Sequence, residues 1–375
     1  MKFSCERSFL QNAINTASRA AAVKSAVSSL EGLLIETAEN VTITGYNLKT
    51  GIKTALNADI YEEGSIVLNS RLFGDIIRRL DDDIVTIESN ENLLVKISCG
   101  MSEFEIMGIP ASDYPELPSV DFQQSFQMPE KTLKDMIGQT LFAISDNEAR
   151  PIHTGSLFDI EGDMLTIVSV DGYRLALRRE TLKTLEESSL NGCNFVVPGY
   201  ALSEVEKILS DSEDDMVKIT LGSKHIMITI SSTIVISRRL EGEFLNYKNA
   251  IPRTCKYSIT ADRRSLISAV ERVSLIISDK LKSPVRCVFG DHVLSVYTST
   301  ALGKASDECP TQGDGEGLEI GFNNRYILDA LKAAPADSLR LQLSSGVTPC
   351  IIVPADEKTN FLYMVLPVRL RSNEN

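Results

Sequence analysis

A pattern of secondary-structure signals recurs three times along the 375 residues, with a period close to one third of the chain. In each copy, a short extended piece precedes a stretch in which apolar residues recur mostly at the three- and four-residue intervals of an amphipathic helix. These apolar positions are Leu10, Ala13, Ile14 and Ala17 in the first copy, Leu133, Met136, Ile137 and Leu141 in the second, and Leu266, Ile267, Val270 and Val273 in the third.

A pair of strand-like segments follows each of these helices. The small break between the paired strands falls at Gly45, Gly172 and Ser299, each 127 residues from the next. A second strand and helix come afterwards, and a last strand pair closes each copy. Chance periodicity in an ordinary chain is the alternative, but the order, type and spacing of the elements all agree.

The repeat predicts an α+β protein, because runs of antiparallel strands with helices on one face belong to that class rather than to doubly wound α/β folds. Each copy divides again into two similar halves, so the chain reads as six helix-plus-sheet units. Proline-containing stretches at residues 115–118 and 251–252 separate the copies. We therefore expect three repeated domains, at residues 1–120, 121–251 and 252–375.

The composition of the chain favours a cytoplasmic protein over a membrane-spanning or secreted one. The longest apolar runs are about six residues, far below the roughly 20 that cross a bilayer, and the charged N-terminus does not read as a secretory signal. Seven scattered cysteines without a CxxC pair favour a reducing cytoplasm over a disulfide framework. His153, His225 and His292 are too far apart in sequence for a local metal motif, so we expect neither a metal nor a cofactor.

Motifs for catalysis are sparse. The chain lacks GxSxG, HExxH, Walker A and a helix-opening GxGxxG. The acidic glycine-rich stretch QGDGEG at residues 312–317 lacks the lysine of a phosphate-binding loop, and it is interpreted as a flexible connection. A hydrolase that uses Asp171 and His153 stays open as an alternative, and so does a protein-interaction scaffold that does not bind DNA.

Net charge is −13, which argues against a nucleic-acid binder when the chain is taken as a whole. The predicted helices nevertheless carry lysine and arginine, and a local basic surface attracts phosphate whatever the total charge. Acidic residues lie among these cations, so charge alone leaves DNA binding and ordinary solvated helix faces equally open. The cations are Arg7, Arg19, Arg71, Arg78, Arg79, Lys131, Lys134, Lys207, Arg263, Arg264, Arg272, Arg325 and Lys332.

Four segments in order along the chain carry a family resemblance. They are MKFSCERSFL at the start, DGYRLAL at residues 171–177, IGFNNRYILDAL at 320–331 and YMVLPVRL at 363–370. Together with the threefold repeat, they resemble the bacterial DNA polymerase III beta subunits, which are sliding clamps. The resemblance implies a ring-shaped homodimer without catalytic activity that encircles duplex DNA, independently of its sequence, and serves the replicative polymerase as a processivity factor.

The resemblance also implies where DNA and the second subunit bind. Contacts to DNA phosphates are implied at Lys24, Arg71, Arg78 and Arg150. The ring interface is implied between two apolar pairs from opposite ends of the chain, namely Phe104 with Ile106 and Ile276 with Ile277. Packing of these residues in the core of a single chain is the alternative.

A pocket for short apolar peptides is implied on the second domain near the third. Its expected partners are the DNA polymerase III alpha subunit, the clamp loader, other polymerases and repair proteins. The matching residues are Gly172, Tyr173, Arg174, Leu175, Leu245, Asn323, Tyr326, Val347, Met364, Leu366, Pro367, Val368 and Arg369. Ordinary core burial competes with this role for Leu175, Val347 and Leu366.

The chain departs from the family pattern at several places. Gly199 and Tyr200 stand where the family usually has a basic pair, and Leu245 and Asn246 interrupt an FPxY pattern. Residues 371–375 extend past the leucine at which the family often ends. We hypothesise that this tail lies beside the peptide pocket and modulates entry, and equal peptide affinities with and without the tail would reject the idea.

Overall fold

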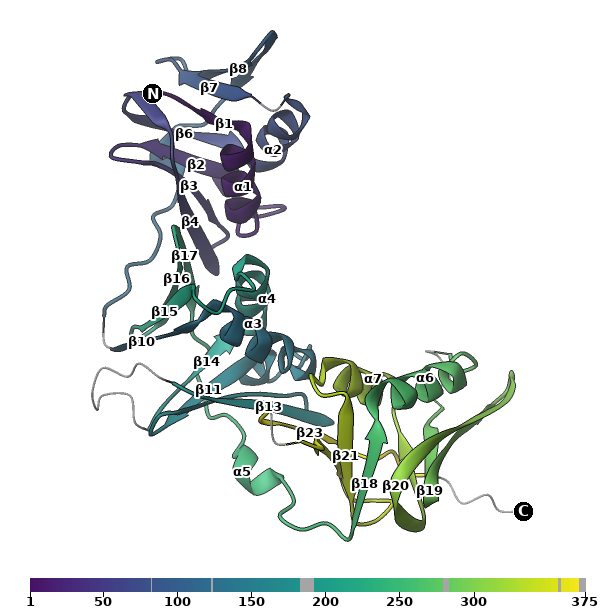
Figure 1. Cartoon of the computed structure of the whole chain (residues 1–375). Coiled ribbons are helices and arrows are strands. Elements are labelled where there is room, and N and C mark those ends of the chain that lie inside the picture. The colour runs from purple at the N-terminus through teal and green to yellow at the C-terminus, as the bar shows by residue number, and fades with distance from the viewer. Residues whose placement is uncertain (82, 123, 183–191, 279–282, 357–358, 371–375) are drawn as a thin grey trace. The chain divides into compact units, whose positions relative to one another are not determined.

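The structure is a computed structural model, and it describes residues 1–81, 83–122, 124–182, 192–278, 283–356 and 359–370 (Figure 1). The chain groups into two compact units. Over the described residues, the first comprises 1–134 and 204–239, and the second comprises 135–182, 192–203 and 240–370. The domain boundaries expected near residues 120 and 251 stay a prediction.

Antiparallel strands and short helices alternate throughout the described residues. The helices are α1 (Arg7–Ser18), α2 (Ser70–Arg79), α3 (Glu130–Gly138), α4 (Gly199–Ile208), α5 (Tyr247–Ala250), α6 (Arg263–Ser274) and α7 (Asn324–Ala333). Short 3-10 turns are η1 (Ser28–Glu31), η2 (Ala111–Asp113), η3 (Leu141–Ala143) and η4 (Pro151–Thr154). No helix in the described ranges is long and apolar enough to cross a membrane.

The first unit holds two antiparallel sheets. A five-stranded sheet has the order β5 (Asp59–Glu62), β1 (Lys2–Glu6), β7 (Ile84–Ser89), β8 (Leu94–Cys99) and β9 (Ser102–Met107). An eight-stranded sheet has the order β10 (Gln124–Pro129), β15 (Met216–Leu221), β16 (His225–Ile230), β17 (Thr233–Arg238), β4 (Thr50–Leu56), β3 (Val41–Tyr46), β2 (Gly32–Thr37) and β6 (Gly64–Asn69). Helix α1 packs against α2 and against β3 and β4.

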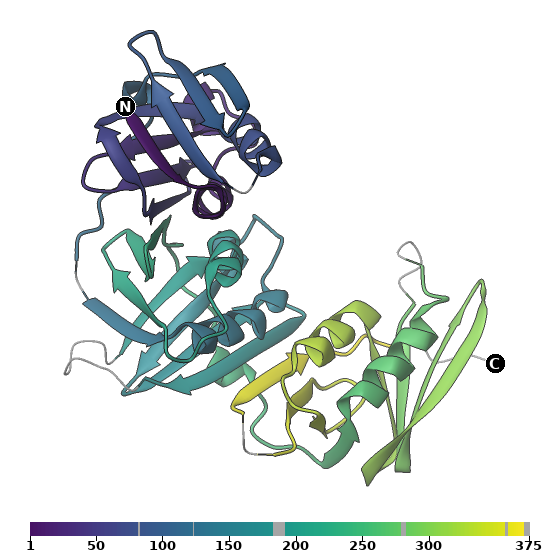
Figure 2. The ribbon, with the colours of Figure 1, turned by 45° about the horizontal axis from the view of Figure 1, so that its top comes forward.

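The second unit is built on one ten-stranded antiparallel sheet. Its order is β14 (Cys193–Pro198), β11 (Gly155–Glu161), β12 (Met164–Val170), β13 (Arg174–Thr181), β23 (Phe361–Val365), β22 (Cys350–Pro354), β21 (Ser338–Leu343), β18 (Tyr257–Asp262), β20 (Gly303–Phe322) and β19 (Val285–Thr300). Helices α6 and α7 pack against each other, and α6 also packs on β18, β19 and β20 (Figure 2).

The predicted helical periodicity is confirmed where the apolar face meets a sheet. All four apolar positions of the first copy are buried in α1, and Leu266, Val270 and Val273 are buried in α6. Burial of such a face against a sheet, rather than helix propensity, supplies most of the stability of helices this short. These helices therefore need the sheets on which they pack.

Each sheet junction between repeats is made by direct strand pairing. Strand β17 of the second copy pairs with β4 of the first, with Thr233 opposite Thr54. Strand β23 of the third copy pairs with β13 of the second, with Arg174 opposite Val365. Backbone hydrogen bonds thus run without interruption from one repeat into the next at both places.

Two local expectations are wrong. The helix expected to reach Leu141 ends at Gly138, and Leu141 begins the separate turn η3, because glycine costs helix stability and favours a break. The stretch 312–317 is not a loose connection but lies within β20, where Gln312 pairs with Thr260 and Asp314 with Asp291. Positive φ values at Gly313, Glu316 and Gly317 accommodate the irregular register there.

Candidate functional surfaces

The turn from β12 into β13 places the first of the predicted pocket residues. Gly172 has a φ of +90°, in the left-handed region that glycine adopts without steric cost. The Oδ1 atom of Asp171 accepts hydrogen bonds from the backbone N–H groups of Tyr173 at 2.8 Å and Arg174 at 3.0 Å. This Asx turn holds the backbone in place while the Tyr173 side chain stays 60% exposed.

Arg174 is buried, with 7% of its surface exposed. Its Nε donates to Asp171 Oδ2 at 2.9 Å, and its Nη1 donates to Asp329 Oδ2 of α7 at 2.6 Å. The guanidinium carbon also lies 4.6 Å from the centroid of the Tyr326 ring, a cation–π contact. The charge of Arg174 is therefore neutralised within the fold, and the side chain links β13 to α7.

Tyr173 and Tyr326 form a stacked aromatic pair. Their ring centroids are 5.8 Å apart and their planes differ by 23°. Burial raises the pKa of the Tyr326 phenol, so this hydroxyl stays protonated at neutral pH. One ring is exposed and the other is half-buried, and together they present an apolar surface with phenolic hydroxyls, the composition that recurs in hot spots of peptide recognition.

The other predicted pocket residues on and after β13 and β23 differ in how deeply their side chains are buried. Leu175 and Met364 are buried and belong to one apolar core cluster, and their expected role in the pocket stays a prediction. Leu366 is half-buried, and its backbone N–H donates to the carbonyl of Tyr173 at 2.8 Å. Pro367 and Val368 are half-buried as well, and Arg369 is exposed. The tail at residues 371–375 lies outside the described residues.

A hollow of ≈ 480 Å³, which we call the Leu245 hollow, includes one predicted pocket residue. Ile152, His153 and Phe244 line it together with Leu245 and the predicted DNA contact Arg150. The His153 ring meets Phe244 edge to face at 5.5 Å. Burial, and then the nearby Arg150 charge, lower the pKa of His153 and favour its neutral form.

Sequence reasoning did not include Ile152 and Phe244 in the pocket. The sequence does contain a signal for an apolar contact at Phe244, because Phe244 and Leu245 are adjacent large apolar residues within the polar linker 241–246. Ile152 follows Pro151 in the short turn η4, where an apolar side chain is not expected to be solvated. Their proximity depends on the linker folding back beside η4, which no local pattern encodes.

A second hollow of ≈ 350 Å³, the Asn323 hollow, is lined in part by Tyr326. The Oδ1 of Asn323 accepts from the backbone N–H groups of Arg325 and Tyr326, so Asn323 caps the start of α7. Val368 and Ile277 also line this hollow. The predicted pocket residue Val347 lines neither hollow, and it is 74% exposed in a turn that Ser345 and Thr348 close.

The predicted DNA contacts are all exposed side chains. Lys24 lies in the loop after α1, and Arg71 and Arg78 lie on α2. Arg78 also bonds Asp75 at 3.0 Å. Arg150 immediately precedes η4 and belongs to the second unit, whereas the other three belong to the first.

Most other helix cations are paired with carboxylates. The pairs are Arg19–Glu204, Lys131–Glu213, Lys134–Asp211, Lys207–Glu204, Arg272–Asp307 and Lys332–Glu271. Exposed pairs of this kind contribute little to stability, typically 0–1 kcal/mol, and remain free to exchange partners. They do reduce the local positive potential, so any attraction of phosphate to these helices is weak.

The predicted interface residues lie at sheet edges or beside them. Strand β9 is the last strand of the five-stranded sheet, and Phe104 on it is 39% exposed while Ile106 is half-buried. Ile276 and Ile277 follow α6 and are half-buried, and Ile277 packs on the core of the second unit. The carbonyl of Ile276 accepts from Thr300 Oγ1 at 3.1 Å, which places it near the β19–β20 turn.

The geometry gives no support to catalysis by Asp171 and His153. Asp171 is occupied by the turn and by Arg174, while the His153 ring packs on Phe244. Within the described ranges, no hydrogen bond joins the two residues, and no group of three or more His, Cys, Asp or Glu side chains is arranged to hold a metal ion.

Three models of one family match consecutive parts of the chain. The N-terminal domain of the DNA polymerase III beta subunit matches residues 1–118, the central domain matches 127–246, and the C-terminal domain matches 248–369. The chain belongs to the DNA polymerase III beta subunit family. Members of this family are sliding clamps, which act in DNA replication as non-catalytic processivity factors, and the chain is assigned this function rather than that of a hydrolase.

Individual relatives agree with the family models. The beta sliding clamp of Halalkalibacterium halodurans is 31% identical over 98% of this chain and 100% of its own length. The crystal structure of the DNA polymerase sliding clamp from Bacillus subtilis has a TM-score of 0.93 at 28% identity, covering 99% of this chain and 100% of that one. A putative DNA polymerase III beta subunit from Eubacterium rectale has a TM-score of 0.92 at 30% identity, covering 98% and 99% of the two chains. The expected fold class, three repeated clamp domains of α+β type, is thereby confirmed.

Proposed function

We propose that two copies of this chain close into a ring around duplex DNA and tether the replicative polymerase to it. The continuous sheets support the ring. Repeats one and two join through β4 and β17, and repeats two and three join through β13 and β23. A chain with three repeats can make two such junctions by itself, and a third junction requires a strand from a second copy.

The strands that would form the third junction are open along one edge. Strand β9 pairs with β8 and ends the five-stranded sheet. The counterpart of β4 and β13 in the third repeat is the first half of β20, which pairs with β19 from Gly303 to Pro310. The other edge of β20 pairs with β18 at Thr311 and Gln312, which lie just after this half. Antiparallel pairing of β9 with this half of β20 in the partner would repeat the two internal junctions.

Exposed apolar side chains on β9 favour the same interface. Phe104 is 39% exposed and Met107 is 66% exposed, on a strand whose backbone edge is open. An exposed apolar edge strand readily pairs with another chain, so monomeric proteins usually protect such edges. Burial of these side chains against the partner would supply apolar area in addition to the backbone hydrogen bonds. The hydrogen bond from Thr300 Oγ1 to the carbonyl of Ile276, beside the turn that leads into β20, supports the proposed role of Ile276 and Ile277 in this interface.

We propose that the peptide-binding pocket comprises the tyrosine pair, the Asn323 hollow that Tyr326 helps to line, and the Leu245 hollow. Tyr173 and Tyr326 supply the apolar platform, Leu245 and Phe244 line one hollow, and Val368 lines the other. An extended peptide with two large apolar side chains could anchor one in each hollow. The partners we propose are the DNA polymerase III alpha subunit, the clamp loader, and other polymerases and repair proteins that carry short clamp-binding peptides.

We propose that DNA is held by enclosure, with weak phosphate contacts at Lys24, Arg71, Arg78 and Arg150. Phosphate contacts carry no sequence information, which suits a protein that must slide. Most neighbouring helix cations are paired with carboxylates, and this pairing weakens the attraction between any single cation and a DNA phosphate. We also propose three domains at residues 1–120, 121–251 and 252–375, and a cytoplasmic location together with the chromosome.

Retention on DNA of different topology tests the function. Protein loaded by a clamp loader should remain on nicked circular DNA during gel filtration at high salt. It should leave within the same period once the circle is linearised, because a ring slides off a free end. Equal retention on the two forms would contradict enclosure and support ordinary binding. Loss from both forms would support a scaffold that does not need DNA.

A further inference from the structure

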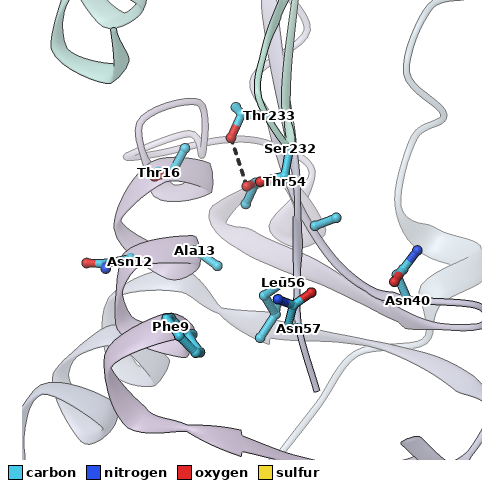
Figure 3. Close-up of a pocket in the computed structure, with 11 residues that line it drawn as sticks. Phe9, Asn12, Ala13, Thr16, Asn40, Thr54, Leu56, Asn57, Ser232 and Thr233 are labelled. Carbon is cyan, nitrogen blue, oxygen red and sulfur yellow. Dashed lines mark hydrogen bonds between the residues drawn. The ribbon is translucent and has the colours of Figure 1, made fainter. Parts of the chain in front are cut away.

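A hollow of ≈ 550 Å³ lies in the first unit between α1 and the junction of β4 with β17, and it shares no residue with the proposed peptide pocket. Figure 3 shows side chains of α1 on one side of it and those of β4 and the β16–β17 turn on the other. Its volume lies within the roughly 300–1,000 Å³ typical of small-molecule sites. The hollow is therefore large enough to hold a planar ring.

The β4–β17 junction and the β13–β23 junction have the same strand pairing, but they differ in the side chains beside the hollow. The N–H of Ala55 donates to the carbonyl of Ser232 at 3.0 Å, and the N–H of Arg179 donates to the carbonyl of Asn360 at 2.9 Å in the other junction. Next to this hydrogen bond in the β4–β17 junction, Thr54 is paired across the strands with Thr233. In the other it is Arg178 opposite Phe361, and both of those long side chains are buried.

The hollow thus results from small side chains at one junction and is not required by the strand pairing. Thr54 and Thr233 are buried, and their hydroxyls hydrogen-bond each other at 2.9 Å (Figure 3). This satisfies both polar groups and leaves the space beside them open. The junction with Arg178 and Phe361 shows that the same backbone arrangement accepts larger side chains.

The lining of the hollow is polar but uncharged. Carboxamides come from Asn12 on α1, Asn40 before β3 and Asn57 after β4, and hydroxyls come from Thr16 and Ser232. None of the lining residues is ionisable. Asparagine amides can both donate and accept, which matches the mixed edge of a nucleobase. A charged ligand such as a free phosphate would have no counterion there.

Phe9 supplies the aromatic component. It lines the hollow from α1, and its side chain is 48% exposed (Figure 3). An exposed aromatic ring beside hydrogen-bonding side chains is the arrangement by which proteins bind bases of single-stranded nucleic acids. In such sites the ring stacks on the base and the polar groups contact its edge.

We propose that this hollow binds one unpaired nucleobase of single-stranded DNA, stacked on Phe9 and hydrogen-bonded by the surrounding asparagines. The inference rests on the proposed function only in that a sliding clamp has DNA close by. Recognition of a single base without a cationic lining is weak by itself. It would act on DNA that the ring already retains, where the local strand concentration is high.

A short single-stranded oligonucleotide with one 2-aminopurine, a fluorescent adenine analogue, tests the proposal. Stacking on Phe9 should quench the fluorescence, and Phe9→Leu should remove the quenching and weaken binding by about tenfold or more, as expected for the loss of one stacked base. Leucine keeps the apolar bulk on an exposed site, so the variant should fold. Leu72→Ala is the matched control, because Leu72 is equally exposed on α2 but lies outside the hollow.

Equal quenching and affinity in the wild type and Phe9→Leu would overturn the proposal, as would an oligonucleotide that does not bind the wild type at all. A partner peptide in the hollow would give that second result. Retention on nicked circular DNA should be unchanged in Phe9→Leu. The two ideas therefore fail separately, since a protein that fails to bind the base but stays on the circle retains the proposed function.

Discussion

Arg174 and Asp329 form a 2.6 Å ion pair that joins strand β13 to helix α7 within the second unit. The pair lies beside the β13–β23 junction, where the second repeat meets the third. Asp171 holds the same guanidinium from the other side at 2.9 Å, and Tyr326 packs against it. Arg174, which the family resemblance implies for the peptide pocket, thus holds Tyr326 of the proposed aromatic platform in position through these contacts.

Replacing Arg174 with alanine should destabilise the second unit. Removal of one partner from a buried pair leaves the carboxylates of Asp171 and Asp329 uncompensated, at a cost of about 3–5 kcal/mol. Urea unfolding followed by circular dichroism would measure this change. Arg174→Lys should recover only part of it, because an ammonium cannot reproduce two directed guanidinium bonds. The control is Arg325→Ala on the same helix, whose Nε lies 3.9 Å from Asp329 and whose side chain is exposed, and it should change the free energy of unfolding by less than about 1 kcal/mol.

Tyr173→Ala should weaken binding of a clamp-binding peptide while leaving the fold and the dimer intact. Tyr173 is exposed, and its loss removes the outer ring of the stacked pair; hot-spot aromatic residues typically contribute at least about 2 kcal/mol, or roughly thirtyfold in affinity. Fluorescence anisotropy with a labelled peptide would measure it. Leu72→Ala is an exposed control on α2 that lines neither hollow, and an equal loss in both variants would place the pocket elsewhere.

Substitutions at Leu175 and Leu366 should distinguish a residue that stabilises the core from a residue that contacts a bound peptide. Leu175 is fully buried, so Leu175→Ala should lower stability by roughly 2–5 kcal/mol through a cavity. Leu366 is half-buried next to Tyr173, and Leu366→Asp should reduce peptide affinity with a smaller change in stability. Parallel unfolding and anisotropy measurements would distinguish the two roles. A peptide-binding defect in Leu175→Ala without a change in unfolding would contradict this assignment.

Phe104→Glu should shift the protein from dimer to monomer. A charge on β9 must be buried or repelled if that strand pairs with a partner. Sedimentation should then give a mass near the 41.2 kDa of one chain instead of about 82 kDa for two. Leu72→Glu, on the exposed side of α2, should leave the mass at that of the dimer. A wild type that is monomeric at micromolar concentration would rule out the proposed ring.

Arg71→Ala should reduce the dependence of DNA binding on salt. Each phosphate contact contributes a slope of roughly 0.9 in the logarithm of affinity against the logarithm of salt concentration. Lys96→Ala is a suitable control because Lys96 pairs with Glu103 on a strand rather than lying on a helix. Titrations at several salt concentrations would show an unchanged slope for Arg71→Ala if this side chain does not meet phosphate.

The stability of the second unit should fall as the pH drops through the ordinary histidine range. Burial and Arg150 lower the pKa of folded His153 below its usual value near 6.5. The unfolded chain therefore binds a proton first, so stability is lost from about pH 6.5 downward and the loss ends below the folded pKa. His153→Gln should flatten this part of the pH profile. An NMR titration that finds the His153 pKa at or above 6.5 would contradict the prediction.

The helices of the repeat could be predicted in detail, and the strand register only in part. Leu10, Ala13, Ile14 and Ala17 are the buried residues of α1 because helical periodicity depends on near neighbours along the chain. The local composition of the glycine-rich stretch at residues 312–317 predicts a loop. Pairing of Gln312 with Thr260 and of Asp314 with Asp291 holds it in β20, and these partners are 52 and 23 positions away along the chain.

The sequence by itself determined the threefold repeat, the α+β class and the family, because these depend on spacing and on short motifs that can be read along the chain. The tertiary structure decided which side chains are available for contact. It placed Arg174 between two carboxylates, Leu175 in the core and Ile152 beside Phe244. Such relationships join residues as much as 155 positions apart, and they exist only once strands and linkers pack together.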